Sequence, residues 1–351
     1  MKKLIFLFII LFIPIGVYAD SAASSIVMDV DSGRILYSNN KDDKHLIAST
    51  TKIMTCIIAL ENLDLEKEIT VGDEVLTMYG TNIYIEKGEK LKVKDLLYGL
   101  MLRSGNDAAM TLAINTSKTE EEFVKKMNEK AHELGMSNTT FKNPHGLDDK
   151  TMNYSTAYDM AILGRYAYKN KTYRKIVSTK KYVTKSSLKS YVWYNRVSII
   201  NSYKYSLGGK NGYTPKAGKS LVSYAKKGNS TFMIVTLDDP DIYDNHIYLY
   251  NKYFKKYKTY LIIDKNIFLQ NSNLIKQQAY IKKSFYYPLS EEEKEITTTL
   301  VELYKKPKNN ILGKMSIKID NNEVGSRTIY QNKNKKEDIS IFQKFKKSFI
   351  R

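Results

Sequence analysis

The sequence contains very little cysteine, histidine and proline. Of its 351 residues only Cys56 is a cysteine, so the chain can form no internal disulfide and no cysteine-rich zinc site. Six prolines and 17 glycines are too few for a collagen-like or low-complexity chain. Histidine is also scarce, and no two histidines have the HExxH spacing of a zinc metalloprotease. The four are His45, His132, His145 and His246.

The composition is that of a folded protein with a surplus of positive charge. Hydrophobic residues make up 42% of the chain and charged residues 26%, which is enough apolar material for a core. At about 150 residues per domain, the length suggests about two domains. Lysine and arginine number 56 against 37 aspartates and glutamates, so the net charge is +19. Such a surplus favours anionic partners.

A long apolar run lies at the N-terminus. Residues 4–17 are almost wholly apolar, follow Lys2 and Lys3, and lead to the small-residue site Val17-Tyr18-Ala19. This pattern predicts a secretory signal peptide over residues 1–19. The alternative is an uncleaved anchor, although the run is short for a membrane span of ~20 residues. An exported chain without a disulfide fits the extracytoplasmic face of a bacterial membrane, where we expect no nucleic acid as partner.

The pattern of apolar residues predicts two kinds of region. Up to about residue 264, hairpins at both ends of a mostly helical middle predict one mixed sheet covered by helices. Beyond it, short strands separated by turn residues predict a small β-rich domain over residues 265–332. The expected hairpins cover residues 25–37 and 221–237, the helices residues 49–63, 93–102, 108–114, 120–134 and 156–169, and the later strands residues 276–286, 297–304, 315–320 and 325–330.

A serine and a lysine stand three residues apart where the helix of residues 49–63 begins. They are Ser49 and Lys52. Because residues i and i+3 share a helix face, the lysine amine can take the proton of the serine hydroxyl, provided that burial and nearby positive charge keep the amine neutral. The free backbone N–H groups at a helix start also suit an oxyanion. The pair indicates nucleophilic catalysis by serine.

Two further polar triplets follow in the chain. Ser104-Gly105-Asn106 lies on a turn between two helices, where Ser104 can relay a proton and Asn106 can hold Lys52. Lys210-Asn211-Gly212 precedes the strand at Leu221, where its lysine adds positive potential and its glycine allows a substrate backbone to lie close. Each element alone is a weak signal, because Ser-x-x-Lys recurs at Ser38, Ser178, Ser186 and Ser223. Their order and their context make the combination informative.

Together the three elements resemble the penicillin-recognising serine enzymes. Longer segments narrow the resemblance to low-molecular-mass penicillin-binding proteins, the serine-type D-Ala-D-Ala carboxypeptidases of peptidase family S11. These segments are residues 47–55, 96–109, 143–147, 154–160 and 209–222. The resemblance implies an α/β (α+β) fold of the serine β-lactamase/transpeptidase type over residues 24–264, with an antiparallel-dominated sheet and helices on both sides. It also implies that no metal and no organic cofactor is needed.

The resemblance also implies a reaction and its residues. Ser49 attacks the peptide bond between the two terminal D-alanines of a peptidoglycan stem peptide, Lys52 is the general base, and Ser104 and Asn106 assist. Substrate-binding residues are Lys210, Asn211, Gly212 and Tyr213, the last through its backbone N–H, and β-lactams are expected inhibitors. The family usually has threonine at the position of Asn211. Three alternatives therefore stay open: a catalytically weakened homologue that binds wall peptide or penicillin, a D,D-endopeptidase and a β-lactamase.

The C-terminal segment, residues 338–351, is basic and amphipathic. Within it, Ile341, Phe342, Phe345 and Phe349 share one face of a helix, and cations occupy much of the rest. This pattern predicts an interfacial helix on an anionic membrane surface. The alternatives are a helix docked on the second domain and a frayed basic tail.

Overall fold

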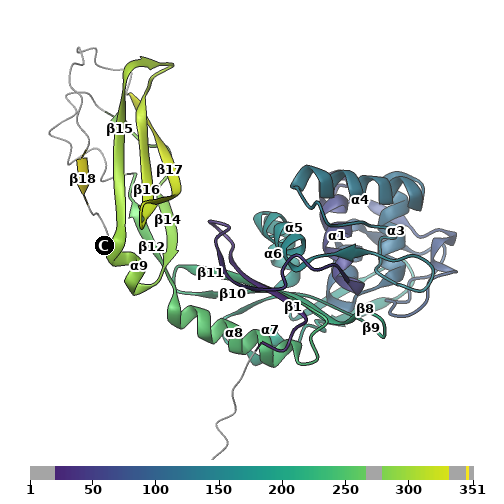
Figure 1. The fold of residues 1–351 in the computed structure, drawn as a ribbon. Coiled ribbons are helices and arrows are strands. Elements are labelled where there is room, and N and C mark those ends of the chain that lie inside the picture. Colours follow the sequence, from purple (N-terminus) through teal and green to yellow (C-terminus); the bar gives the residue numbers. More distant parts are fainter. Residues whose placement is uncertain (1–19, 266–278, 332–344, 348–351) are drawn as a thin grey trace, which may run out of the picture.

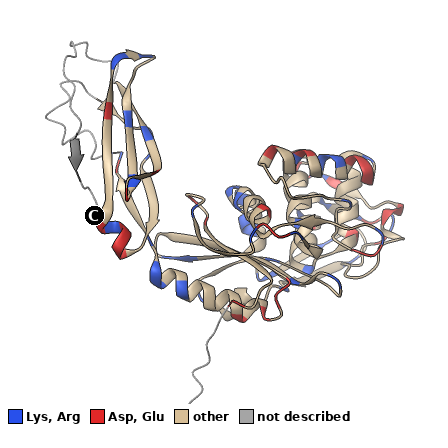
Figure 2. Ribbon diagram, in the orientation of Figure 1, with Lys and Arg blue, Asp and Glu red and all other residues tan. Residues whose placement is uncertain are grey.

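The structure is a computed structural model that describes residues 20–265, 279–331 and 345–347. The expected signal peptide, residues 1–19, and most of the basic segment, residues 338–351, lie outside the described residues. Within the described part of the chain, no helix has the length and apolar character needed to cross a membrane. Lys and Arg occur on both parts of the molecule and are interspersed with Asp and Glu (Figure 2).

A five-stranded antiparallel sheet organises the first part of the molecule (Figure 1). Its strand order is β2-β1-β11-β10-β9. The expected hairpins are confirmed, since β1 pairs with β2 and β10 pairs with β11. Ile26 and Val222 both pair with Val235, so the first and last thirds of this part meet in the middle of the sheet. The strands are β1 Ser24–Asp29, β2 Ile35–Asn39, β9 Ser206–Thr214, β10 Gly218–Lys227 and β11 Ser230–Leu237.

Helices cover both faces of this sheet, as predicted. Alternate residues of β1 point to opposite faces, so Ile26 joins the larger core and Val27 the smaller one. The larger core packs the sheet against a group of helices that includes α1 Lys52–Asn62, α3 Asn106–Ser117, α4 Glu120–Leu134 and α5 Ala157–Lys169. The smaller core packs the other face against α7 Ile199–Ser202 and α8 Ile242–Lys256.

The helix boundaries follow local capping chemistry. The predicted helix of residues 120–134 is α4, which begins where the Thr119 hydroxyl accepts the Glu122 N–H at 3.1 Å and ends at Gly135, whose φ is +79°. The predicted helix of residues 93–102 is α2 Val93–Tyr98, extended by the π-helical turn η3 Gly99–Arg103. Smaller elements complete this part: β3 His45–Leu46 with β6 Tyr154–Ser155, β4 Glu68–Thr70 with β5 Lys90–Lys92, β7 Lys181–Lys185 with β8 Ser190–Tyr194, η2 Asp73–Val75 and α6 Lys171–Val177.

The later part of the chain is β-rich, as predicted, and has its own hydrophobic core. A two-stranded pair, β12 with β14, leads into a second antiparallel sheet of order β13-β17-β16-β15-β18. The single strand expected over residues 276–286 is in fact two, because a bend separates β13 from β14. The bounds are β12 Lys258–Ile263, β13 Ala279–Tyr280, β14 Phe285–Leu289, α9 Glu291–Ile296, β15 Thr297–Lys308, β16 Ile311–Ile319 and β17 Asn322–Gln331.

The prediction of a C-terminal helix is wrong where the structure describes that segment. Phe345–Lys347 forms strand β18, which pairs antiparallel with β15, Lys346 opposite Leu300. The physical reason is the exposed edge of β15, whose unpaired backbone N–H and C=O groups accept another strand. The remaining residues of the predicted helix lie outside the described residues.

One arginine joins the two parts of the molecule. The Arg34 guanidinium forms an ion pair with the Glu293 carboxylate and donates to the Pro288 carbonyl oxygen at 2.6 Å. It also lies between the rings of Tyr257 and Tyr287, 5.2 Å from each ring centre. These contacts hold β14 and α9 beside the β1–β2 hairpin, and the second sheet extends away from the first (Figure 1).

Candidate active site

The serine and lysine predicted as nucleophile and base lie side by side. Ser49 is in the tight helical turn η1 Ala48–Thr51, which runs directly into α1 at Lys52. The Lys52 Nζ lies 3.0 Å from the Ser49 Oγ, within hydrogen-bond distance. Ala48, immediately before the serine, has a φ of +43°, and Gly146 packs against its carbonyl group. A Cβ at Gly146 would lie 2.0 Å from that carbonyl oxygen, so this position requires glycine.

Lys52 is fully buried, and its other hydrogen bonds go to uncharged acceptors. Its Nζ donates to the Asn106 Oδ1 at 2.7 Å and to the His145 carbonyl oxygen at 2.5 Å. Burial, and then the positive charge of Lys210, lower the pKa of Lys52 well below its usual value, while Asp107 opposes the shift. A lysine in this setting can hold its amine neutral and accept the serine proton.

Asn106 is fixed by the start of α3. Its side-chain amide donates to the Tyr79 carbonyl oxygen at 2.7 Å, and its backbone N–H donates to the Thr81 carbonyl oxygen at 2.7 Å. The next residue, Asp107, is buried and accepts backbone N–H groups of the adjacent loop, among them Ile83 at 3.0 Å. Sequence reasoning missed Asp107, although its place directly after Asn106 at a helix start was a usable signal.

Ser104 lies two residues before Asn106 in the chain, at the end of the π-helical turn η3. It has a φ of +65°, which ends the π-helical turn, and its side chain is 8% exposed. In residues 20–265 and 279–331, its hydroxyl takes part in no hydrogen bond. Asn106 therefore contacts Lys52 directly. Proton relay by Ser104 stays a prediction.

A backbone carbonyl that sequence reasoning missed completes the surroundings of Lys52. The loop that carries His145 is held by Asn143, whose Oδ1 accepts the Gly146 N–H at 2.6 Å, and by Asn153, whose Nδ2 donates to the Asn143 carbonyl oxygen at 3.0 Å. The His145 ring accepts the Leu147 N–H, and burial, followed by the charge of Lys52, lowers its pKa to about 3. Its imidazole is thus neutral, and its carbonyl oxygen is the group that contacts the lysine.

The third polar triplet lies within β9, the edge strand of the central sheet, which pairs with β10 at Leu221. Lys210 is fully buried, and its Nζ donates to the Asn211 carbonyl oxygen at 2.5 Å. Burial, and then the charge of Arg196, lower the pKa of Lys210 to about 7. The Asn211 Nδ2 donates to the Tyr243 hydroxyl at 3.3 Å. One amide hydrogen of Asn211 is therefore already directed toward α8.

The backbone of β9 runs against the nucleophile turn. A Cβ added at Gly212 would lie 2.8 Å from the Ser49 backbone nitrogen and 3.0 Å from that of Thr50. Glycine is therefore needed for this close approach. The next residue, Tyr213, has a side chain that is 63% exposed, so the backbone rather than the ring lies beside the turn.

The polar groups around Ser49 are of the kinds that take part in acyl transfer. Within residues 20–265 and 279–331, no group of three or more His, Cys, Asp and Glu side chains could hold a metal ion. Cys56, one turn along α1 from Lys52, is buried, and burial raises the pKa of its thiol. The polar groups that meet at Ser49 are hydroxyl, amine, amide and backbone groups, the set used for acyl transfer.

Comparison with known proteins agrees with this geometry. The model of peptidase family S11, D-alanyl-D-alanine carboxypeptidase, matches residues 17–241. The chain belongs to this family. The family predicted from the motifs is thus confirmed. The matched region contains all of the predicted site residues.

Individual S11 relatives differ in how much of their length is matched. The D-alanyl-D-alanine carboxypeptidase DacF of Bacillus subtilis is 41% identical over 218 residues, which are 60% of this chain and 56% of DacF. The D-alanyl-D-alanine carboxypeptidase of Streptomyces sp. K15 is 33% identical over 240 residues, 63% of this chain and 82% of that protein. The chain therefore spans little more than half the length of the first relative.

Solved structures share the fold. The D-alanyl-D-alanine carboxypeptidase of Mycobacterium tuberculosis superposes with a TM-score of 0.65 and 29% identity, over 68% of this chain and 92% of that one. Penicillin-binding protein 5 of Haemophilus influenzae has a TM-score of 0.74, over 90% of this chain and 97% of that one. At 24% identity, this second likeness shows the fold alone, and it includes the C-terminal β-rich part.

Proposed function

We propose that this protein is a serine D,D-carboxypeptidase that removes the terminal D-alanine from peptidoglycan stem peptides through an acyl-enzyme. The observation that carries the proposal is the 3.0 Å contact between the Lys52 Nζ and the Ser49 Oγ, with the lysine fully buried and its pKa lowered. The names of the S11 relatives support the same substrate class.

In the first step, the Ser49 Oγ attacks the carbonyl carbon between the two terminal D-alanines, and its proton passes to the neutral Lys52 amine. The carbonyl oxygen becomes an oxyanion that faces the backbone N–H groups of Ser49 and Tyr213. The close approach of Gly212 to the Ser49 nitrogen supports this arrangement. The C–N bond then breaks, and the leaving D-alanine takes the proton that Lys52 received, with Ser104 as relay.

In the second step, water attacks the acyl group on Ser49, with Lys52 again as base, and releases the shortened peptide. Asn106 acts through Lys52, because its side-chain oxygen holds the amine 2.7 Å away. Lys210 adds positive potential near the D-alanine carboxylate, and Asn211 stands where the family usually has threonine. The second amide hydrogen of Asn211 is the donor that remains for this carboxylate.

The position of the protein in the cell is also part of the proposal. The expected signal peptide and the proposed substrate class support a position on the extracytoplasmic face of a bacterial membrane. We extend the proposal to an anionic membrane surface, bound through the cations of residues 338–351. Deletion of residues 338–351 is expected to abolish binding to vesicles of anionic lipid while release of D-alanine from a soluble peptide is unchanged. Undiminished vesicle binding after the deletion rejects this extension.

The test of the main proposal is incubation with a pentapeptide that ends in D-Ala-D-Ala and, separately, with labelled penicillin. Stoichiometric release of D-alanine together with long-lived penicillin labelling is the expected result. Labelling without release indicates a binding protein, and rapid turnover of penicillin indicates a β-lactamase. Cleavage confined to cross-linked dimers indicates an endopeptidase.

A further inference from the structure

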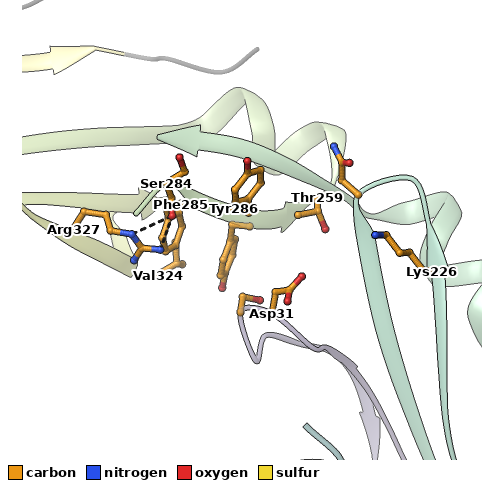
Figure 3. Close-up of a pocket in the computed structure, with 11 residues that line it drawn as sticks. Asp31, Lys226, Thr259, Ser284, Phe285, Tyr286, Val324 and Arg327 are labelled. Atoms are coloured by element: carbon orange, nitrogen blue, oxygen red, sulfur yellow. Dashed lines mark hydrogen bonds between the residues drawn. The ribbon is translucent and has the colours of Figure 1, made fainter. Parts of the chain in front are cut away.

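A pocket lies where the two parts of the molecule meet (Figure 3), and none of its lining residues belongs to the candidate active site. Its volume is about 610 Å³. One wall comes from the turns of the β1–β2 and β10–β11 hairpins and the other from β12, β14 and β17. The residues that matter for the argument are Asp31, Lys226, Thr259, Tyr286 and Arg327. Sites between domains are common places for ligands, because two walls converge there.

The walls of this pocket are fixed without a ligand. The ion pair and ring contacts of Arg34 join the first hairpin to β14. On the other side, the Thr259 backbone N–H donates to the Ser230 hydroxyl at 2.9 Å, which ties β12 to β11. The Arg327 guanidinium is held by the Ser284 carbonyl oxygen at 3.0 Å. The pocket is therefore preformed.

One buried polar atom lines the pocket with no partner. The Thr259 side chain is 9% exposed, yet its hydroxyl has no hydrogen-bond partner among the described residues. A buried hydroxyl without a partner carries a desolvation cost, which rotation of the Thr259 side chain toward a bound ligand would remove. In Figure 3, Thr259 and Asp31 lie between Lys226 at one end and Arg327 at the other.

The chemistry of the lining selects a class of ligand. Lys226 and Arg327 only donate hydrogen bonds, the Asp31 carboxylate only accepts, and the Thr259 hydroxyl can do either. The Tyr286 ring, 47% exposed, offers an apolar face. A sugar chain supplies hydroxyl donors, hydroxyl and amide acceptors and apolar ring faces, and so matches all of them. A phosphate polymer such as poly(glycerol phosphate) matches less well, because its phosphates are repelled by Asp31 and it offers no apolar ring face to Tyr286.

The pocket lies within reach of the proposed active site. Ser220, which pairs with Gly212 beside the nucleophile, is six residues from Lys226 along β10. At about 3.3 Å per residue this separation is about 20 Å. Four residues of the stem precede the bond that Ser49 attacks, and when extended they span about 13 Å, so a stem directed along β10 places its attachment point within about 7 Å of Lys226.

We infer that this junction pocket binds the glycan strand of the polymer whose stem peptides enter the active site. The inference rests on the proposed function, from which the identity of the glycan follows. Bound there, the strand presents successive stems to Ser49, so the pocket lowers the KM for polymeric substrate and leaves free peptide unaffected.

The test is titration calorimetry of the full chain with peptide-free glycan strands released from peptidoglycan by an amidase. Two variants probe exposed lining residues, Tyr286→Ala and Lys226→Gln, and each is expected to weaken binding about tenfold. Their matched controls are Tyr304→Ala, a tyrosine of the same 47% exposure on β15, and Lys227→Gln, the neighbouring lysine outside the pocket. Both controls are expected to bind like the natural protein.

A third variant separates a ligand role from a structural one. Thr259→Val removes the unpartnered hydroxyl, so it should raise the Tm of the free protein while it weakens glycan binding. An unchanged affinity for glycan in all three variants overturns the inference, as does equal loss in the controls. Binding of poly(glycerol phosphate) without binding of glycan overturns it in favour of an anionic polymer.

Penicillin labelling of the same variants keeps this test distinct from that of the proposed function. Labelling at the natural rate with loss of glycan binding is the expected result. If the natural protein binds glycan but neither takes up penicillin nor releases D-alanine, the proposed function fails and the pocket stands. The KM for D-alanine release should rise for glycan-linked pentapeptide and stay constant for free pentapeptide.

Discussion

Two lysines, one in each part of the molecule, lie in opposite environments. At the active site Lys52 is fully buried, and burial lowers its pKa. In the second sheet Lys314 is partly exposed, and its hydrogen bond to the Glu323 carboxylate raises its pKa. A surface ion pair of that kind contributes little to stability, because water and salt screen it. The difference shows which lysine can do chemistry. The buried Lys52 has a lowered pKa and can serve as a base at neutral pH, whereas Lys314 has a raised pKa and stays protonated.

The same contrast exists in how the two regions are assembled. The three long strands of the second sheet form consecutive hairpins, β15 with β16 and β16 with β17. The active site instead joins the turn at Ser49, the start of α3, the loop at His145 and the edge strand β9. Removing one residue from the site should therefore disable it, while the sheet should tolerate surface changes.

The largest expected effect is that of Lys52→Gln. General bases typically contribute 10²–10⁴-fold to rate, so acylation by fluorescent penicillin should slow by about 10³-fold. The matched control is Lys314→Gln, which should acylate at the natural rate. Stopped-flow fluorescence measures both, with circular dichroism as the check on folding. A loss of less than tenfold for Lys52→Gln would mean that another group takes the Ser49 proton.

The next effect concerns Asn211. Threonine offers a compact hydroxyl to the substrate carboxylate, whereas the amide of Asn211 reaches further and is partly engaged by Tyr243. A well-placed hydrogen bond to a charged group is worth ~1.5–3 kcal/mol. Asn211→Thr should therefore raise kcat/KM for D-alanine release by about tenfold or more. Asn211→Ala should lower it.

The prediction is that kcat/KM falls in the order threonine, asparagine, alanine at position 211. If Asn211→Thr is slower than the natural protein, the amide is itself an adapted ligand. The preferred substrate would then end in something other than D-Ala-D-Ala.

Lys210→Gln tests the coupling between the two buried lysines. The charge of Lys210 lowers the pKa of Lys52, so its removal should raise that pKa. The amine then becomes neutral only at higher pH, and the acid limb of the acylation rate profile should move to higher pH. Arg196→Gln should raise the pKa of Lys210 itself from about 7, because Arg196 is the charge that lowers it. If the acid limb of the acylation rate profile lies at the same pH in Lys210→Gln as in the natural protein, the two lysines are not coupled.

The smallest expected effect on activity is that of Arg34→Gln. This change removes the ion pair with Glu293 and should cost about 1–2 kcal/mol where the two parts meet. Calorimetric unfolding should show a lower Tm, while the rate of D-alanine release from a free pentapeptide stays the same. Slower release would mean that the second sheet supports the active site as well as the junction.

Much of the fold could be predicted because local signals agree with it. The hairpin around Gly33 and the capped helix α4 have turn and cap residues in place. Strand β9 was missed because Gly208, Gly209 and Gly212 give it a low strand propensity, and its pairing with β10 is set by tertiary structure. Helix α8 was missed although its buried residues recur every three or four positions. They include Ile242, His246, Leu249, Tyr250 and Tyr253.

The side chains of the candidate active site could be predicted from the sequence, but its backbone groups could not. Ser49, Lys52 and Asn106 could be assigned from spacing and order, and the structure brings them into contact. The role of the His145 carbonyl oxygen could not be assigned, since every residue has a backbone carbonyl whatever its type. The helix expected at the C-terminus was wrong at Phe345–Lys347 because amphipathic spacing says nothing about a free sheet edge nearby.

The most direct test of the account is to find which residue penicillin acylates. The protein is incubated with benzylpenicillin, digested, and the modified peptide is sequenced by mass spectrometry, with Ser49→Ala as the control. The account predicts one adduct per chain, on Ser49, and none on the folded Ser49→Ala variant. An adduct on Ser38, Ser178, Ser186 or Ser223, or an undiminished adduct in Ser49→Ala, would contradict it.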